Sequence, residues 1–324
     1  LGDVYKRQDE YDALCGSIHS LQKKEKLKNR IFYLSTSPKF YDHILTHIQK
    51  HKLHKNEGRG FSKVVLEKPF GEDLASALKI NRKLQRVFSE DQIYRTDHYL
   101  AKNIVQDMIA LRSTNRVFSP IWKKEHVDHI QIILSEDFGV ATRGAFYDKY
   151  GALKDVVQNH ILQLLAISLI DDVHHLNDKI LRDQKIEILK NIRVEKVVVG
   201  QYQGYRKEKG VSAQSTIETC AALKVFVNIP RWKGIPIYLL TGKHLQKRLS
   251  SVHIAFKKAD STFLGGSDFE SNYLTFQIQP NQGFYLRLNA KDPEHDTVAP
   301  VRMSFCHNCI CLLYTSPSPR DNTG

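Results

Sequence analysis

Hydrophobic positions are spaced in two ways along the first hundred residues, and each spacing predicts its own element. Short apolar runs bounded by turn residues are typical of buried strands, and apolar residues that recur every three or four positions are typical of one helix face. The predicted strands are 30–34, 63–66 and 92–95, and the predicted helices are about 40–48 and 73–88. The expected apolar face of the second helix is Leu74, Ala77, Leu78, Leu84 and Val87. Strand–helix alternation favours a parallel sheet with crossover helices.

The pattern changes after about Asp97. We expect a helix from there to about Leu111, a strand over 129–134, and a helix over 153–171 that is apolar almost all round and therefore buried. The remainder has strand patterns without helices between them, which argues for an antiparallel sheet. Those strands are predicted at 197–202, 219–227, 235–240, 252–256, 273–279 and 284–288. Two domains follow, residues 9–97 and 98–310.

Composition adds a globular balance and a basic charge. The 324 residues are 41% hydrophobic and 26% charged, with a net charge of +13. No apolar run approaches the roughly 20 residues that a membrane span needs. The charge suggests anionic small molecules or polyanions as partners, but the basic clusters show no recognition-helix pattern, and solvated faces explain most of them. Cys306 and Cys309 have CxxC spacing without a second pair, so we prefer reduced bystander thiols and expect no metal.

The two ends of the chain carry a pattern of a different origin. Residues 3–8 can be back-translated to a DNA string whose reverse complement, read one base on, encodes the sequence of residues 311–315. One sequencing adapter read in both directions explains this match, whereas a natural Ser/Pro-rich tail explains only the second end. We therefore expect residues 1–8 and 311–324 to be artefacts, and the rest to be an internal fragment of a longer protein.

Cationic side chains mark a candidate anion site. Lys68 follows a predicted parallel strand, at the edge where open α/β sheets bind ligands, and Pro69 should hold it in an extended conformation. His98 and Lys102 lie four residues apart at the start of a predicted helix, so they should share one face. The helix N-terminus adds free N–H groups, which favours an anion such as phosphate. Alternatively, Asp97 caps the helix and both side chains are solvated surface groups.

His160 lies in the predicted apolar helix. A buried histidine usually satisfies itself with one hydrogen bond, so a structural role is the simpler interpretation. Yet the same segment carries polar residues that need partners when buried, namely Asp155, Gln158, Asn159 and Gln163, and this cluster indicates a pocket. Asp155 is about 140° away from His160 around an α-helix. A carboxylate from elsewhere is therefore the better partner for His160, and Asp97 is the obvious candidate.

Four motifs in one order carry a resemblance to a known family. They are Glu67-Lys68-Pro69-Phe70-Gly71, Asp97-His98-Tyr99-Leu100-Ala101-Lys102, Asp155-Val156-Val157-Gln158-Asn159-His160 and Gly242-Lys243. With these motifs the chain resembles the glucose-6-phosphate dehydrogenases over about residues 30–309. The resemblance implies an α/β domain, a truncated Rossmann-type dinucleotide-binding fold, followed by an α+β domain with a large, mainly antiparallel sheet. It implies oxidation of D-glucose 6-phosphate at C1 to 6-phosphogluconolactone, with hydride transfer to NADP, or to NAD in some members.

The resemblance also implies a role for each matching residue. His160 would be the general base that takes the proton of the C1 hydroxyl, and Asp97 would orient it, because a carboxylate partner raises the basicity of the ring. The residues that would bind substrate are Lys68, His98, Tyr99, Lys102, Glu136, Asp155, Lys243, Arg248 and Gln279. The residues that would contact the cofactor are Ser35, Lys68 and Pro69.

The chain departs from the family at its beginning, because it has no Gly-rich phosphate loop. We therefore expect the fragment itself to bind cofactor poorly and to be inactive. The complete protein should be a cytoplasmic homodimer or homotetramer in the oxidative pentose phosphate pathway, without a nucleic-acid or membrane partner. Two rival interpretations stay open: a hexose-6-phosphate dehydrogenase with looser sugar choice, and a basic polyanion- or nucleic-acid-binding protein with vestigial dehydrogenase features.

Overall fold

The chain divides into two compact units, residues 1–97 and residues 98–324, in a computed structural model. The structure describes residues 8–55, 60–71, 73–171, 177–260, 269–292 and 297–306. Both expected artefactual ends, apart from Gln8, and the CxxC segment after Cys306 lie outside the described residues.

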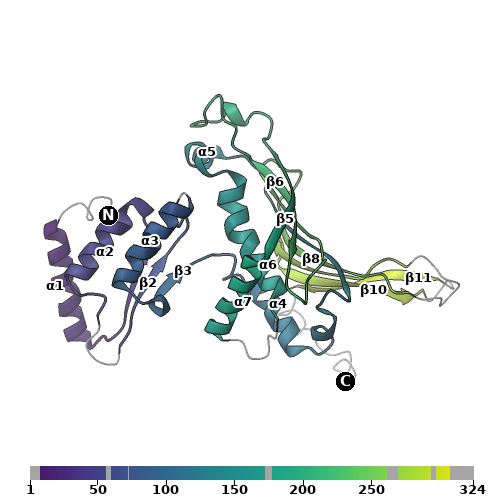
Figure 1. The fold of residues 1–324 in the computed structure, drawn as a ribbon, viewed down its shortest axis with the longest axis horizontal. Coiled ribbons are helices and arrows are strands. Elements are labelled where there is room, and N and C mark those ends of the chain that lie inside the picture. The colour runs from purple at the N-terminus through teal and green to yellow at the C-terminus, as the bar shows by residue number, and fades with distance from the viewer. Residues whose placement is uncertain are drawn as a thin grey trace, which may run out of the picture. The chain divides into compact units, whose positions relative to one another are not determined.

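The first unit is a three-stranded parallel sheet in the order β1–β2–β3, with its helices packed into one core (Figure 1). Its elements are α1 (Gln8–Glu25), β1 (Arg30–Leu34), α2 (Tyr41–Lys50), β2 (Ser62–Leu66), α3 (Leu74–Val87) and β3 (Ile93–Arg95). Along β1, Leu34 is buried in the core whereas Ile31 and Tyr33 are exposed. One sheet face is therefore covered and the other is open, and the predicted parallel strands are confirmed.

Two details of this unit differ from the sequence prediction. Leu74 and Leu78 are exposed on α3, and the buried apolar residues of this helix are Leu84 and Val87. The apolar spacing thus predicts the direction of the packed face but not its length. Helix α1 was not predicted, because its sequence is largely polar and only a few side chains, such as Tyr11 and Cys15, reach the core.

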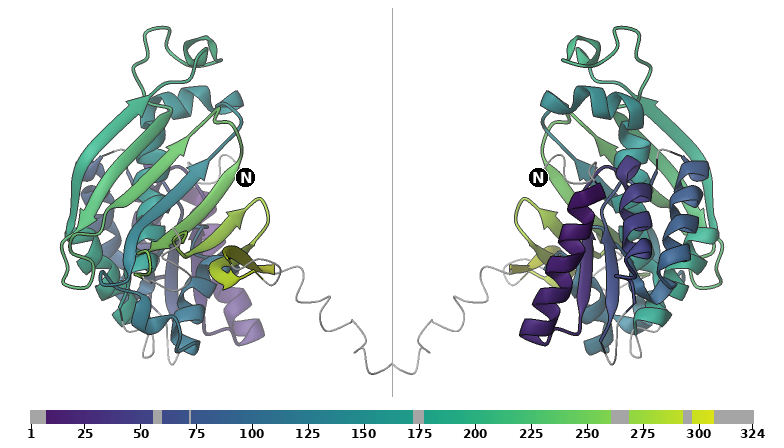
Figure 2. Two further views of the ribbon diagram at one scale, coloured as in Figure 1. Left: turned by 90° about the vertical axis from the view of Figure 1, so that its right-hand side faces the viewer. Right: turned by 90° about the vertical axis from the view of Figure 1, so that its left-hand side faces the viewer.

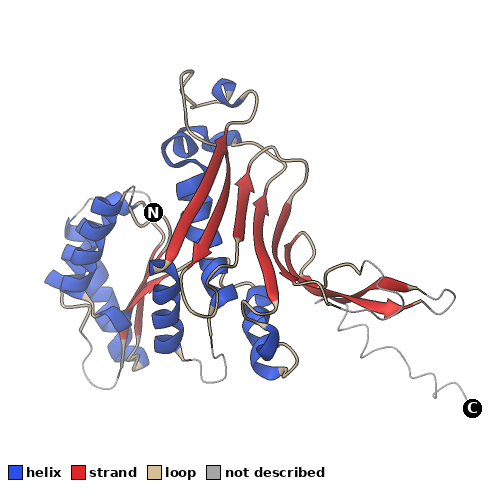
Figure 3. Cartoon of the chain, turned by 45° about the vertical axis from the view of Figure 1, so that its right-hand side comes forward, coloured by secondary structure: helices blue, strands red, loops and turns tan. Residues whose placement is uncertain are grey.

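The second unit packs helices against one face of an eight-stranded sheet, in the order β11–β10–β9–β8–β4–β7–β6–β5. Figure 2 (left) looks onto the other face of this sheet, and Figure 3 shows β10 and β11 extending beyond the helices as a hairpin. The strands are β4 (Val127–Ser135), β5 (Ile192–Gly200), β6 (Cys220–Val227), β7 (Ile237–Gly242), β8 (Leu249–Phe256), β9 (Tyr273–Gln279), β10 (Gly283–Lys291) and β11 (Val298–Cys306). Neighbouring strands are antiparallel except β4 and β7, which run parallel.

The helices of this unit are α4 (Asn103–Thr114), α5 (Gly144–Ala152), a π-helix (Leu153–Ile161), α6 (Leu162–Leu169) and α7 (Asp178–Lys190). The predicted long apolar helix is buried, as expected, but it consists of the π-helix and α6 in succession. Its side chains share one core with the inner face of the sheet. The prediction of strands alone after residue 171 was wrong, because α7 precedes β5. Strand β11 was also missed.

Candidate active site

His98, Tyr99 and Lys102 lie in a turn that precedes α4. The helix begins only at Asn103, and Lys102 is its N-cap residue, with φ −73° and ψ 132°. The predictions that His98 and Lys102 share a helix face and that Asp97 is a helix cap are therefore wrong. The turn is closed by the Lys102 amide, which donates to the Tyr99 carbonyl at 3.2 Å. It places Lys102 Nζ 5.3 Å from the centre of the Tyr99 ring, so a turn, and not a helix face, groups these side chains.

The same turn lies against His160. The His160 ring is 4.4 Å, centre to centre, from both the His98 ring and the Tyr99 ring. His160 is buried, whereas His98 is exposed. The Tyr99 hydroxyl lies 3.4 Å from Ser250 Oγ, which in turn lies 3.5 Å from Gln279 Oε1. Two predicted site residues, His98 and Tyr99, thus contact the buried His160. Two others join them through Tyr99: Lys102 directly, and Gln279 by way of Ser250.

A second group forms where the two parallel strands end. Ser135 of β4 pairs with Gly242 of β7, so the next residues, Glu136 and Lys243, leave the sheet side by side. Lys243 Nζ donates to Glu136 Oε2 at 2.5 Å, and the lysine is buried apart from 9% of its surface. The carboxyl ends of parallel strands meet at one sheet edge, which brings together residues 107 apart in the chain.

Aromatic rings surround the ammonium group of Lys243. Its Nζ lies 5.3 Å from the centre of the Phe138 ring and 5.1 Å from that of Tyr147, and cation–π attraction is strengthened in such a desolvated place. The guanidinium of Arg248, another predicted substrate-binding residue, lies 5.8 Å from the centre of the same Phe138 ring. Arg248 itself is exposed. Neither Phe138 nor Tyr147 was predicted as a site residue, because their place beside Lys243 depends on contacts between distant parts of the chain.

The π-helix connects the two groups. It packs against β4 and β7 and carries both Asp155 and His160. Hydrogen bonds in a π-helix join residues five apart, so these two residues lie about one turn apart on nearly the same face. The expected separation of about 140° is wrong, because it assumed an α-helix. Burial raises the pKa of Tyr147, and the nearby carboxylates of Asp155 and Glu136 raise it further, so both carboxylates lie near the Lys243 group.

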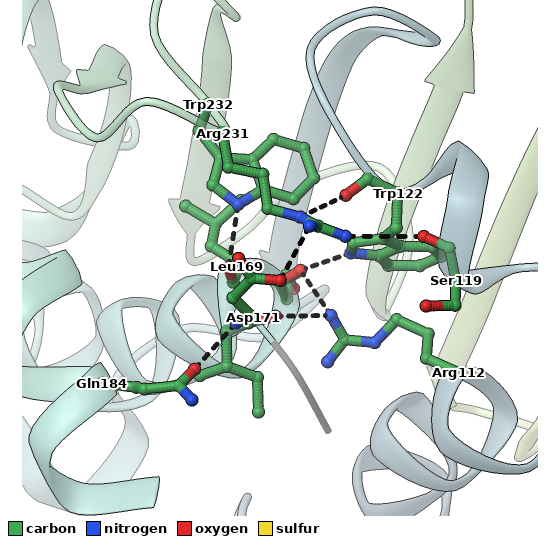
Figure 4. Close-up of polar contacts among 10 residues, drawn as sticks. Arg112, Ser119, Trp122, Leu169, Asp171, Gln184, Arg231 and Trp232 are labelled. Atoms are coloured by element: carbon green, nitrogen blue, oxygen red, sulfur yellow. Dashed lines mark hydrogen bonds and ion pairs between the residues drawn. The ribbon is translucent and has the colours of Figure 1, made fainter. Parts of the chain in front are cut away.

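The far end of α6 is fixed by a buried arginine (Figure 4). Arg112 is 2% exposed and donates to the carbonyls of Ile167 and Ile170, each at 3.0 Å, and of Ser168 at 3.4 Å. Burial and, to a smaller extent, the charge of Arg231 lower the pKa of Arg112 to about 9, against the opposite effect of Asp171. The last carbonyls of a helix have no partner within the helix, and Arg112 supplies one.

Both tryptophans of the chain bond to the same turn. Trp122 Nε1 donates to the Ser168 carbonyl at 2.7 Å, and Trp232 Nε1 donates to the Leu169 carbonyl at 2.8 Å (Figure 4). Arg231 joins this network through an ion pair with Asp171 at 2.7 Å. The helical segment that carries His160 is therefore held at its C-terminal end by charged and aromatic donors.

The remaining predicted residues lie in the first unit. Ser35 follows β1 and Lys68 follows β2, so both lie at the carboxyl edge of the parallel sheet. Ser35 Oγ donates to Glu67 Oε2 at 3.5 Å, and the Tyr33 hydroxyl also donates to Glu67, which raises the pKa of Tyr33. The Lys68–Pro69 peptide is cis.

A dinucleotide fits this edge in part. The Ser35 hydroxyl and the Glu67 carboxylate suit ribose hydroxyls, and the Lys68 ammonium suits a phosphate or amide oxygen. Among the residues of this unit that the structure describes, no glycine-rich turn joins a strand to a helix, so they supply no phosphate loop of that kind. Asp97 ends this unit, directly before His98 in the chain. Its pairing with His160 stays a prediction.

Two profiles of one protein family match nearly the whole chain. The sequence profile "Glucose-6-phosphate dehydrogenase, C-terminal domain" matches residues 109–316, and "Glucose-6-phosphate dehydrogenase, NAD binding domain" matches residues 2–107. The chain belongs to the glucose-6-phosphate dehydrogenase family. The predicted fold class is thereby confirmed: a nicotinamide-dinucleotide-binding α/β domain precedes a domain with a large, mainly antiparallel sheet.

Individual relatives support the family assignment. Glucose-6-phosphate 1-dehydrogenase of Chlamydia muridarum is 36% identical over 91% of this chain, and that of Borreliella burgdorferi is 40% identical over 88%. A solved structure of glucose-6-phosphate dehydrogenase in complex with its substrate glucose-6-phosphate superposes with a TM-score of 0.87 at 29% identity, over 97% of this chain and 66% of that one. The chain spans 63% of the length of each of the two sequence relatives.

None of the helices that the structure describes combines the length and the apolar character required to cross a membrane.

Proposed function

We propose that the complete protein oxidises D-glucose 6-phosphate at C1 to 6-phosphogluconolactone and transfers the hydride to NADP. One observation carries this proposal: the buried histidine His160 contacts a turn with an exposed histidine, a tyrosine and a lysine. A base next to phosphate-binding donors is what oxidation of a phosphorylated sugar requires. The family assignment and the relatives' names support the same reaction.

Each residue then has a defined task. His160 removes the proton of the C1 hydroxyl while the hydride leaves C1, so that the C1–O bond becomes the lactone carbonyl. Asp97 orients the His160 ring and stabilises its protonated form. The cationic and hydrogen-bonding side chains of His98, Tyr99 and Lys102 hold the phosphate, and this fixes the distance from C1 to the base.

The second group binds the sugar ring. Glu136 and Asp155 accept hydrogen bonds from sugar hydroxyls, and Lys243 donates a hydrogen bond to the sugar. Arg248 and Gln279 close the site from the sheet. Because Lys243 is already held by Glu136 and by two aromatic rings, it needs little reordering when the substrate binds.

The cofactor lies at the carboxyl edge of the first sheet in this proposal. When bound, the nicotinamide ring supplies the acceptor for the hydride. Ser35 and Pro69 line its site, and Lys68 bridges the cofactor and the substrate. We further propose that the complete protein is a cytoplasmic homodimer or homotetramer and acts at the entry of the oxidative pentose phosphate pathway.

The test uses the full-length protein and two variants. His160→Ala should lower kcat by about 10²–10⁴-fold, which is the contribution expected of a general base, with little change in substrate affinity. His126→Ala is the matched control, because this histidine lies in the loop before β4 and the proposal gives it no task. The proposal is wrong if the parent protein does not reduce NADP or NAD with glucose 6-phosphate, or if His160→Ala turns over as fast as the parent.

A further inference from the structure

The N-terminal end of the π-helix is capped by a residue far away in the chain. The first amides of a helix have no partner within it. Here the Ala152 amide donates to the Glu218 carbonyl at 3.0 Å, and the Leu153 amide donates to Glu218 Oε1, also at 3.0 Å. One residue therefore accepts from two successive amides at the start of the helix that carries Asp155 and His160.

Gly151 leaves room for this cap. It has φ +67°, a conformation that side chains rarely adopt, and separates α5 from the π-helix. A Cβ atom on Gly151 would lie 2.4 Å from Glu218 Oε1. The Glu218 carboxylate thus packs directly on the backbone of Gly151, and its position is fixed from two sides.

Thr219, the residue after Glu218, connects this cap to Lys243 of the proposed sugar site. The Thr219 carbonyl accepts from the Lys243 amide at 2.9 Å. Thr219 is fully buried, and its hydroxyl accepts from the Tyr202 amide at 2.8 Å. Residues 218 and 219 therefore hydrogen-bond to the start of the π-helix on one side and to the backbone of Lys243 on the other.

Glu218 also lies near the carboxylates of the proposed sugar site. Burial contributes most to the raised pKa of the Tyr147 hydroxyl, and the charge of Glu218, like those of Asp155 and Glu136, raises it further. A shift of the Glu218 segment would therefore move the start of the π-helix and the backbone of Lys243 together.

From this geometry we infer that Glu218 is a positioning residue for the reaction: it fixes the π-helix that carries Asp155 and His160 relative to Lys243. The inference rests on the proposed function, because it assigns Glu218 a part in the same site. Glu218 touches neither substrate nor reacting atoms in this scheme and acts through the backbone that it caps.

The experiment compares Glu218→Ala with Glu218→Gln in the full-length protein. Alanine removes the side-chain acceptor, so kcat/KM for glucose 6-phosphate should fall by about 10- to 100-fold, as for a misplacement of about 1 Å. Glutamine keeps an oxygen at the same reach and should stay within about threefold of the parent. Glu195→Ala is the control, because that exposed carboxylate pairs only with Lys224 on the sheet edge among the described contacts.

Amide hydrogen exchange gives a second readout that needs no activity. In Glu218→Ala the amides of residues 152–156 should exchange faster than in the parent, whereas Glu218→Gln should keep their protection. If the alanine variant does not fold, Glu218→Asp replaces it, because its carboxylate reaches one methylene less and should lose activity relative to Glu218→Gln.

The outcomes separate the two proposals. A parent protein without dehydrogenase activity refutes the proposed function, while the exchange data still test the cap. With an active parent, an unchanged kcat/KM in Glu218→Ala overturns the positioning role, even if the melting temperature falls. An equal loss in Glu218→Gln and Glu218→Ala overturns it as well, because a retained acceptor should rescue a cap.

Discussion

Arg112 offers the sharpest test of what holds the His160 segment. Arg112→Met fills most of the volume but removes every donor, so the carbonyls of Ile167 and Ile170 lose the side-chain partners that they have at 3.0 Å. The Ser168 carbonyl keeps the Trp122 donor at 2.7 Å. Each of the two buried carbonyls loses its Arg112 donor at a cost of about 1–3 kcal/mol, and the arginine's own desolvation cost is relieved. The net loss should be about 2–4 kcal/mol.

The assay is urea unfolding followed by tryptophan fluorescence. The chain has two tryptophans, and both donate to the turn that Arg112 caps. The emission therefore reports on this turn directly. Arg193→Met is the matched control, because Arg193 is exposed on β5 and lies 5.5 Å from the Phe226 ring; it should change stability by less than about 0.5 kcal/mol. A loss below about 1 kcal/mol for Arg112→Met would refute the reasoning.

Three further predictions concern backbone, pH and phosphate. Gly151→Ala should destabilise by about 1–3 kcal/mol more than Gly204→Ala in thermal melts, since both have positive φ but only the first would meet other atoms; equal losses would contradict this. Burial, then His129 and Arg287, lower the pKa of His253 to about 4. Its neutral form is favoured in the folded state, so stability should fall as pH drops from about 6.5 to 4, by about 1–2 kcal/mol after screening, and melts of His253→Gln over this range should lack that part. Lys102→Gln should raise the KM for glucose 6-phosphate about 10- to 100-fold and leave kcat nearly unchanged, because phosphate binding contributes to ground and transition states alike; an unchanged KM in initial-rate assays would exclude Lys102 as a phosphate ligand.

Periodicity predicted the elements that pack on a core. The strands 30–34 and 273–279 were placed at the observed bounds of β1 and β9, because alternation reflects which face is buried. The segment around His160 was placed correctly as buried, but its π-helical geometry was not predicted. A π-helix differs from an α-helix by one residue in the spacing of its backbone hydrogen bonds. Over nine residues, the spacing of apolar positions does not distinguish the two.

Residues that act through distant contacts were harder to find. Arg112 and Glu218 were both missed, since their partners lie 55 and 65 residues away in the chain. The resemblance predicted Glu136 and Lys243 as site residues, but it did not predict that they pair with each other. That pairing depends on one parallel contact within an otherwise antiparallel sheet, and no local pattern records it.

The parallel contact between β4 and β7 also determines when the site forms during folding. Glu136 and Lys243 are 107 residues apart, and closing so long a loop is slow and entropically costly. The proposed sugar site therefore forms only once β4 and β7 have paired, and a ligand that binds there would recognise only the folded domain. Its binding free energy adds directly to folding stability, about 2.7 kcal/mol at a hundred times Kd. If the proposed function holds, abundant substrate would raise the fraction of the protein that stays folded in the cell.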